Sequence, residues 1–187
     1  NLVALFGAEH GAFGRVEAGE TVGTMVDSRT GIPIHSLYGK SYRPSSEMLA
    51  DIDVMVCDIQ DIGVRYYTYL WTMTHIVEAC GEADVPVIIL DRPNPLGATL
   101  AGCGLNPQFS SLVGRYNILI QHGMTIGEVL LLHNSEWNKT PADLTIIPCE
   151  NYTHHMIWSD FKRPFIPTSP NIPNISTVQQ YVGACLI

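Results

Sequence analysis

Three short apolar runs of the sequence each end in side chains that can carry out acid–base chemistry or bind a polar ligand. These side chains are Glu9 and His10 after residues 2–6, Asp58 and Asp61 after residues 54–57, and Arg92 and Asn94 after residues 85–90. Apolar runs of this length are typical of strands buried on both faces. Because ligands of open α/β sheets bind beyond the carboxyl ends of the strands, we expect these side chains to share one cleft.

Carboxylates, amides, tyrosines and arginines together suit the binding and cleavage of carbohydrates. Cleavage of a glycosidic bond needs a carboxylic acid that protonates the leaving oxygen and a second group that stabilises the oxocarbenium-like centre. Glu9, at the end of a predicted buried strand, is placed to be that general acid/base. The alternative is that Glu9 is a turn residue whose carboxylate accepts from a loop amide.

The elements that must position these residues alternate along the chain. Further strands are expected within residues 32–38, 112–120 and 144–148, and residues 12–31 form a polar loop. After the central strand, apolar residues at helical spacing predict a helix from Tyr69 to Cys80, and capping residues predict helices that begin near Ser45, Thr125 and Ser176. The order predicts an α/β fold with a mostly parallel open sheet and helices on both faces.

Composition and missing motifs exclude several classes of protein. The formal net charge of −8 and the ten basic residues argue against a nucleic-acid partner. No apolar run approaches the ~20 residues that span a bilayer, and neither a nucleotide-binding glycine loop nor a serine-nucleophile motif is present. The five cysteines have neither disulfide nor zinc-knuckle spacing. We expect no cofactor and no metal, and the chain looks cut at both ends.

Six blocks in order along nearly the whole chain carry a specific resemblance. They read LFGAEHGAFG, DSRTGIPIHSLYG, VCDIQDIGVRYYTYLWTM, ILDRPNPLG, LVGRYNILIQHGMTIGE and SPNIP. They resemble the DUF1343 family, whose characterised members, the NamZ enzymes, are exo-β-N-acetylmuramidases that remove N-acetylmuramic acid from the non-reducing ends of peptidoglycan fragments. Ala8 stands where that family usually has proline.

The resemblance implies a Rossmann-like catalytic domain over residues 1–187, followed in the family by a smaller C-terminal domain. By this comparison the chain lacks an opening strand–helix segment before Asn1, and residues 168–187 lead towards the absent C-terminal domain. The implied partner is a peptidoglycan-derived saccharide. The implied location is periplasmic or extracellular in a bacterium, although no export signal is visible in the sequence.

The resemblance also places the catalytic glutamate at Glu9, in agreement with the prediction from the strand ends. Its partner is left open: Asp58 or Asp61 supplies a second carboxylate or caps the following helix, or the 2-acetamido oxygen of the sugar attacks, with an Asp that only orients it. Retaining and inverting outcomes are equally open.

The remaining candidates are predicted to bind the substrate. Arg65 and Arg92 are suited to the lactyl carboxylate of N-acetylmuramic acid, unless one of them pairs with a nearby aspartate. Tyr67, or its neighbour, is expected to stack on a sugar ring, and His10, Asn94 and His122 to contact the substrate or order their turns.

Two other classes of function remain possible at this stage. The first is a sugar-binding protein that binds muramic acid saccharides without cleaving them. The second is a metal-dependent hydrolase with ligands drawn from His10, Asp58, Asp61, Asp91 and His122, for which the residue types fit but the spacing is not diagnostic.

Overall fold

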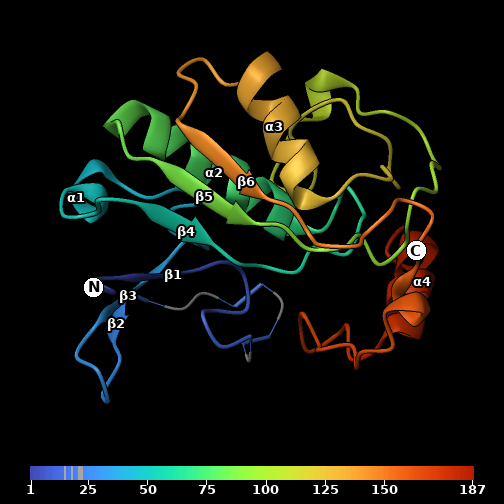
Figure 1. The fold of residues 1–187 in the computed structure, drawn as a ribbon, viewed down its shortest axis with the longest axis horizontal. Coiled ribbons are helices and arrows are strands. Elements are labelled where there is room, and N and C mark those ends of the chain that lie inside the picture. The colour runs from blue at the N-terminus through green and yellow to red at the C-terminus, as the bar shows by residue number, and fades with distance from the viewer. Residues whose placement is uncertain (15, 18, 21–22) are drawn as a thin grey trace.

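The computed structural model of the protein describes residues 1–14, 16–17, 19–20 and 23–187, so four residues of the predicted loop 12–31 lie outside the described part. Strands and helices alternate along the chain, which confirms the α/β class (Figure 1). The strands are β1 (Leu5–Gly7), β2 (Met25–Val26), β3 (Pro33–Ser36), β4 (Met55–Cys57), β5 (Val87–Leu90) and β6 (Leu144–Ile147). The helices are α1 (Ser46–Leu49), α2 (Thr68–Ala83), α3 (Ile126–Glu136) and α4 (Ile175–Ala184), with 3-10 turns η1 (Pro107–Phe109) and η2 (Trp158–Phe161).

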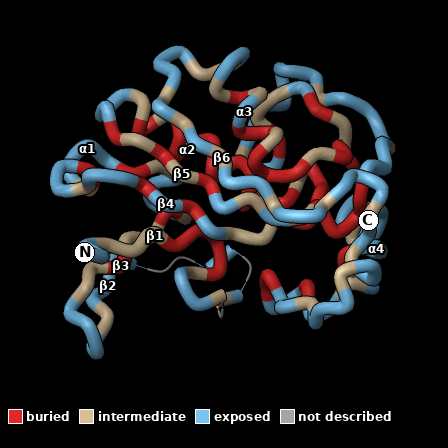
Figure 2. The backbone as a smooth tube through the Cα atoms, in the orientation of Figure 1, coloured by how far each residue is buried: buried red, intermediate tan, exposed pale blue. Residues whose placement is uncertain are grey.

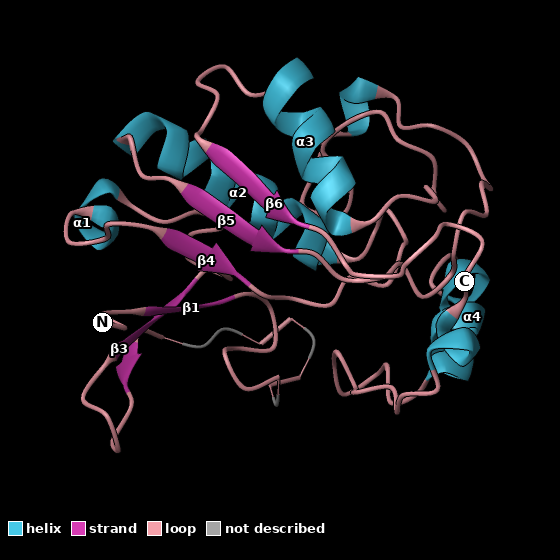
Figure 3. Cartoon of the chain, viewed as in Figure 1, coloured by secondary structure: helices cyan, strands magenta, loops and turns pink. Residues whose placement is uncertain are grey.

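The strands form two three-stranded sheets instead of the single sheet that the sequence predicts (Figure 3). One is fully parallel with the order β4-β5-β6. The other has the order β1-β3-β2, in which β1 and β3 are parallel and the unpredicted β2 is antiparallel. A groove of about 510 Å³ lies between the two sheets, lined by apolar side chains that include Leu5 and Val56.

The parallel sheet is buried on one face. Met55 and Cys57 of β4 are buried, whereas Val56 is 52% exposed and Val54, just before the strand, is 42% exposed. The prediction that this strand is buried on both faces is therefore wrong, because its apolar side chains alternate between a packed and an open face (Figure 2). In the residues that the structure places, the helices that pack on this sheet share its buried face, so helical cover of the second face stays a prediction.

The main core lies between the buried face of this sheet and the helices α2 and α3. Eleven of the sixteen residues of α2 are buried, and Trp71 and Val77 are fully enclosed. They pack in one cluster with Val87 of β5 and with Val129 and Leu130 of α3. The burial of α2 fixes the position of its first turn, which matters because that turn reaches the candidate site.

The helix starts follow local sequence signals in two of three cases. Ser45 caps α1 by accepting from the Met48 amide, and Thr125 forms the predicted capping box with Glu128 at α3. The predicted box at Ser176 is wrong: Asn174 caps α4 by accepting from the Thr177 amide, because an Asn side chain competes well for that position.

The predicted strand within residues 112–120 is absent, since this segment makes only isolated bridges and turns, such as the pairing of Ser111 with Gly114. Over the described ranges, no helix has both the length and the apolar character that a bilayer span requires.

Candidate active site

Glu9 lies two residues beyond β1, with its side chain turned into the protein and only 9% of the residue exposed. Two donors from separate elements hold its carboxylate. The Thr68 hydroxyl donates to Oε2 at 2.6 Å, and the backbone amide of Gly19 donates to Oε1 at 3.1 Å. These two hydrogen bonds fix the orientation of the carboxylate from two sides. No Lys or Arg in the described ranges forms an ion pair with Glu9.

The first turn of α2 forms one wall around Glu9. Thr68 is the first residue of the helix, and its preceding residue, Tyr67, provides no side-chain cap. The Tyr67 hydroxyl donates to Oγ1 of Thr168 at 2.9 Å, and the Tyr69 hydroxyl donates to the Thr168 carbonyl at 2.6 Å. The proline-rich segment that begins at Thr168 is thus fixed to the start of α2. Because its hydroxyl is used in this way, Tyr67 has a structural role, and its predicted stacking on a sugar ring stays a prediction.

Tyr38, just after β3, faces Glu9 from another side. Burial, and then the hydrogen bond and charge of the Glu9 carboxylate, raise the pKa of Tyr38 to about 12. The residue is only partly buried, and its ring packs edge-on against Tyr42 at 5.8 Å between centroids. Tyr38 therefore presents both an aromatic face and a hydroxyl group near the carboxylate.

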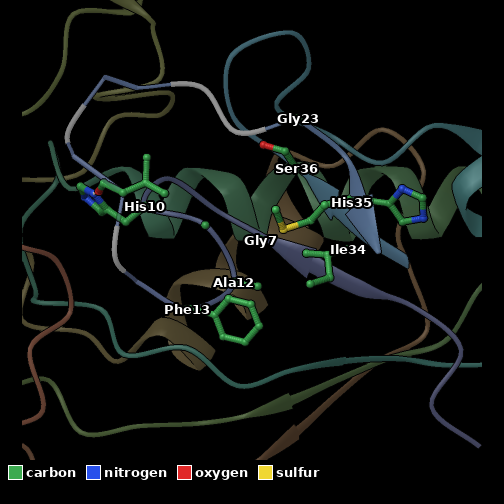
Figure 4. A pocket seen from close by; sticks show the side chains of 11 residues that line it. Gly7, His10, Ala12, Phe13, Gly23, Ile34, His35 and Ser36 are labelled. Carbon is green, nitrogen blue, oxygen red and sulfur yellow. The ribbon is translucent and has the colours of Figure 1, made fainter. Parts of the chain in front are cut away.

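His10 follows Glu9 in a left-handed backbone conformation, with φ of 71°. Its Nδ1 lies 2.7 Å from the Val16 carbonyl, which can only accept, so Nδ1 carries the proton. An apolar pocket of about 180 Å³ lies beside it, between the loop and the β1–β3–β2 sheet. Figure 4 shows His10 at one end of the row of lining residues and His35 at the other, with Phe13 and Ile34 between them. The loop therefore leaves an apolar space beside His10, the residue that follows Glu9.

Asp61 and His122 form a second, fully enclosed group. The Gly63 amide donates to Oδ2 of Asp61 at 2.7 Å, and the Met124 amide donates to Nδ1 of His122 at 3.3 Å. Since Nδ1 accepts, the neutral ring carries its proton on Nε2, which lies 3.8 Å from Oδ2 of Asp61. Burial raises the pKa of Asp61 to about 7 and lowers the pKa of His122 to about 4. At neutral pH the His122 ring is therefore uncharged and Asp61 is about half protonated.

Neither buried group has its full set of hydrogen bonds. Within the part of the chain that the structure covers, Oδ1 of Asp61 and Nε2 of His122 have no hydrogen-bond partner. Their enclosure leaves Asp61 ill suited to be a charged nucleophile at neutral pH.

Asp58 and Arg92 bind each other at the surface. Nε of Arg92 lies 2.6 Å from Oδ1 of Asp58, and their side chains are 43% and 48% exposed. This confirms the alternative in which one arginine pairs with a nearby aspartate. Asp58 also lines the groove between the two sheets. The meeting of Glu9, Asp58 and Arg92 around one sugar-sized hollow stays a prediction.

Arg65 is buried, and one terminal nitrogen of its guanidinium is bound to the backbone. Its Nη1 donates to the carbonyls of Cys103 and Ile118, both at 2.7 Å, and its own carbonyl accepts from the Trp71 indole at 2.6 Å. Arg65 ties the loop after β5 to the start of α2. This arrangement favours a structural role over recognition of a substrate carboxylate.

Asn94 is likewise occupied by the protein. Its Nδ2 donates to the Met124 carbonyl and its Oδ1 accepts from the Leu96 amide, both at 2.9 Å. It is 3% exposed, so it orders the turn after β5, the simpler of its two predicted roles.

The metal-dependent alternative finds no support in the geometry. Asp91 accepts from the Thr125 hydroxyl and the Gly127 amide, and Asp58 is held by Arg92. Among the residues that can be described, no three His, Cys, Asp or Glu side chains come together as a metal site would need.

Sequence reasoning missed the hydroxyl-bearing residues around Glu9, which are Tyr38, Thr68, Tyr69 and Thr168. A signal was present for one of them. Thr68 and Thr72 lie on the buried side of a largely apolar helix, and a buried hydroxyl needs a partner. Its partner, Glu9, lies 59 positions away in the chain, so local sequence patterns cannot identify it.

Comparisons with known proteins agree with this architecture. A family model described as exo-beta-N-acetylmuramidase NamZ, N-terminal, matches residues 1–176. The peptidoglycan beta-N-acetylmuramidase NamZ of Bacillus subtilis (strain 168) is 44% identical over 187 residues, which cover 100% of this chain and 45% of that protein.

Two crystal structures of DUF1343 family proteins from Bacteroides fragilis NCTC 9343 match the fold. Their TM-scores are 0.89 and 0.85 at 40% and 41% identity, and they align with 97% and 100% of this chain. The alignments cover 46% and 48% of the two crystal structures, so the chain spans about half the length of the relatives that it matches. The chain therefore belongs to the family described as exo-beta-N-acetylmuramidase NamZ, N-terminal, whose solved relatives carry the name DUF1343.

Proposed function

We propose that the whole protein is an exo-β-N-acetylmuramidase that releases N-acetylmuramic acid from the non-reducing ends of peptidoglycan fragments, with Glu9 as general acid/base. The observation that carries the proposal is the environment of Glu9. Its buried carboxylate lies beyond the end of a strand and is held by a hydroxyl and an amide. The relative from B. subtilis is named for the same activity.

The reaction needs a group that gives a proton to the leaving oxygen and later takes one from water. Glu9 fits this role because it has no permanent cationic partner in the described residues, and an ion pair would hold it in one protonation state. Its two hydrogen bonds fix the side chain at the end of β1 without preventing it from gaining a proton.

For the second group, the geometry favours the 2-acetamido oxygen of the substrate. Asp58 is held by Arg92 in an exposed ion pair, and Asp61 is enclosed with a pKa raised by burial to about 7. Neither is a free carboxylate poised beside Glu9. A sugar with a 2-acetamido group supplies its own nucleophile, so one protein carboxyl is sufficient in such a mechanism.

Arg92 is the better of the two predicted partners for the lactyl carboxylate. Its guanidinium is exposed, whereas that of Arg65 is buried against backbone carbonyls. Asp58 binds Nε, and the two terminal nitrogens of a guanidinium provide four further N–H donors, enough for a bidentate contact.

The proposed peptidoglycan substrate supports a role in cell-wall turnover and recycling. We therefore propose a periplasmic or extracellular location, because that is where peptidoglycan fragments are exposed to an enzyme. Fractionation of the host cells and their medium, followed by immunoblotting for the whole protein, tests this location.

The test of the reaction is Glu9→Gln in the whole protein, assayed with a chromogenic N-acetylmuramoside. We expect kcat to fall by about 10²- to 10⁴-fold, the range that general acid–base groups contribute. Glu17→Gln is the matched control, because Glu17 is an exposed glutamate of the same loop. Its kcat should stay within about twofold of the parent, as expected for a surface substitution.

Two outcomes would contradict the proposal. Unchanged turnover by Glu9→Gln removes this residue from the mechanism. Tight binding of the muramoside by the parent protein, without any turnover, instead identifies a sugar-binding protein that has no hydrolase activity.

A further inference from the structure

The bond between Glu9 and Thr68 joins two elements that are fixed independently of each other. Glu9 follows β1 of one sheet, and Thr68 is the first residue of α2, which packs on the other sheet. Their side chains meet at 2.6 Å, and each residue is 9% exposed. This contact is therefore shielded from bulk water, which would otherwise compete for both groups.

The hydroxyl of Thr68 does not serve its own helix. The side-chain cap position at the start of α2 is held by Tyr67, which makes no capping hydrogen bond. Thr72, one turn later, differs: its hydroxyl donates to the Thr68 carbonyl at 3.2 Å within the helix. Of these two buried threonines on α2, only Thr68 directs its hydroxyl to a group that the proposed reaction uses.

A hydroxyl is suited to a partner that changes its protonation state. It can donate to a carboxylate and, after rotation about its C–O bond, accept from a carboxylic acid. An ammonium or guanidinium group can only donate, so it cannot accept the O–H of the carboxyl when the oxygen that it faces is protonated. The same Oγ1 atom can therefore hold Glu9 before and after proton transfer.

We propose that Thr68 is a positioning residue that holds the Glu9 side chain in both of its protonation states during glycoside cleavage. This inference rests on the proposed function, because it assigns Thr68 to the same acid–base step. Thr68 contacts neither substrate nor reacting oxygen in this role; it acts through Glu9. The Gly19 amide can only donate, and so it cannot accept a proton carried by the carboxyl group, as the Thr68 hydroxyl can.

The experiment compares Thr68→Val, Thr68→Ser and Thr72→Val in the whole protein. Valine has nearly the shape of threonine and lacks the hydroxyl, whereas serine keeps the hydroxyl. We expect kcat of Thr68→Val to fall by about 10- to 150-fold, the range of a hydrogen bond to a charged group, with little change in KM. Thr68→Ser should recover most of the loss, and Thr72→Val should keep kcat within about threefold of the parent.

The pH dependence separates a positioning role from a purely structural one. Loss of the donor disfavours the carboxylate relative to the acid. The limb of the kcat/KM profile that Glu9→Gln abolishes should therefore move to higher pH in Thr68→Val and stay in place in Thr72→Val. Thr68→Ala is measured in parallel, so that the comparison survives if the valine variant does not fold.

Each outcome decides between the two claims. If Glu9→Gln remains active, the proposed function fails at Glu9 and Thr68 has no acid–base step to support. If Glu9→Gln is inactive while folded Thr68→Val or Thr68→Ala has the parent kcat and pH profile, only the inference about Thr68 is overturned. Equal losses in Thr68→Val and Thr72→Val, with unmoved profiles, also overturn it.

Discussion

Gly63 provides a sharp test of how the candidate site is assembled, because it forms the turn between Asp61 and α2. Its φ is +80°, in the left-handed region that glycine tolerates best. A Cβ at this position would overlap Oδ1 of Asn94 and lie 2.8 Å from its Cγ. Asn94 cannot move away freely, since its amide group bonds to Met124 and Leu96.

Gly63→Ala is therefore expected to destabilise the protein in two ways. The left-handed backbone costs about 1–2 kcal/mol for alanine. Displacement of Asn94 breaks two hydrogen bonds worth about 1 kcal/mol each, so the total loss is about 3–4 kcal/mol. Gly31→Ala is the matched control: its φ is +73°, but nothing lies within 4 Å of the new Cβ, so only the backbone cost applies.

Urea unfolding followed by tryptophan fluorescence measures these differences, because Trp71 is fully enclosed next to this turn. In an Asn94→Ala background the clash is absent, and Gly63→Ala should cost only about 1–2 kcal/mol, the backbone part. Equal losses for Gly63→Ala and Gly31→Ala in the parent background would refute the close packing of this turn against Asn94.

Three further outcomes follow from the buried and exposed charges. Burial raises the pKa of Asp61 from 3.8 to about 7, so its contribution to stability is fully present below pH 3.8 and is lost as the pH rises through 7. Asp61→Asn should remove this loss, and its unfolding free energy relative to the parent should improve by up to about 4 kcal/mol between pH 4 and pH 8, measured by urea unfolding. Arg65→Ala should cost about 2–4 kcal/mol of stability, because it leaves the buried Ile118 carbonyl and the partly buried Cys103 carbonyl without a donor, whereas Arg92→Ala should cost less than about 1 kcal/mol and raise KM for the muramoside. Equal effects of the two arginine substitutions on KM would contradict the assignment of the lactyl contact to Arg92. Tyr38→Phe should lower kcat by about tenfold through loss of one hydroxyl near the catalytic carboxylate, and Tyr42→Phe, on the exposed neighbouring ring, should leave kcat unchanged in the same assay.

Features that depend on neighbours in the chain were predictable from the sequence. The α/β order, the polar residues that follow β1, β4 and β5, and the capping box at Thr125 all come from signals within a few residues. The family assignment rests on motifs of the same local kind. The capping error at Ser176 is equally local, since two adjacent candidates competed and Asn174 took the position.

Features that depend on residues distant in the chain were not predictable. Arg65 looks like a ligand-binding residue in sequence because it follows a polar strand end, yet its partners are carbonyls 38 and 53 residues away. The apolar run around Val56 indicated burial on both faces, although an apolar residue can remain exposed where no element covers it. The partners of Arg65 and the exposure of Val56 both depend on which distant segment packs against them. A single sequence does not show that packing directly.

The two buried carboxyl groups show why the site needs this tertiary arrangement. Both oxygens of Glu9 accept hydrogen bonds, whereas Oδ1 of Asp61 has no partner in the described residues and burial raises the pKa of Asp61 to about 7. Donors from two elements hold the Glu9 carboxylate in place, whereas burial disfavours a full negative charge on Asp61. Tyr67 and Tyr69 pack against each other at 4.8 Å between ring centroids, and the hydroxyl groups of both donate to Thr168. The start of α2 thus gives the proposed catalytic carboxylate a fixed hydrogen-bond donor and ties the segment that begins at Thr168 to the same turn.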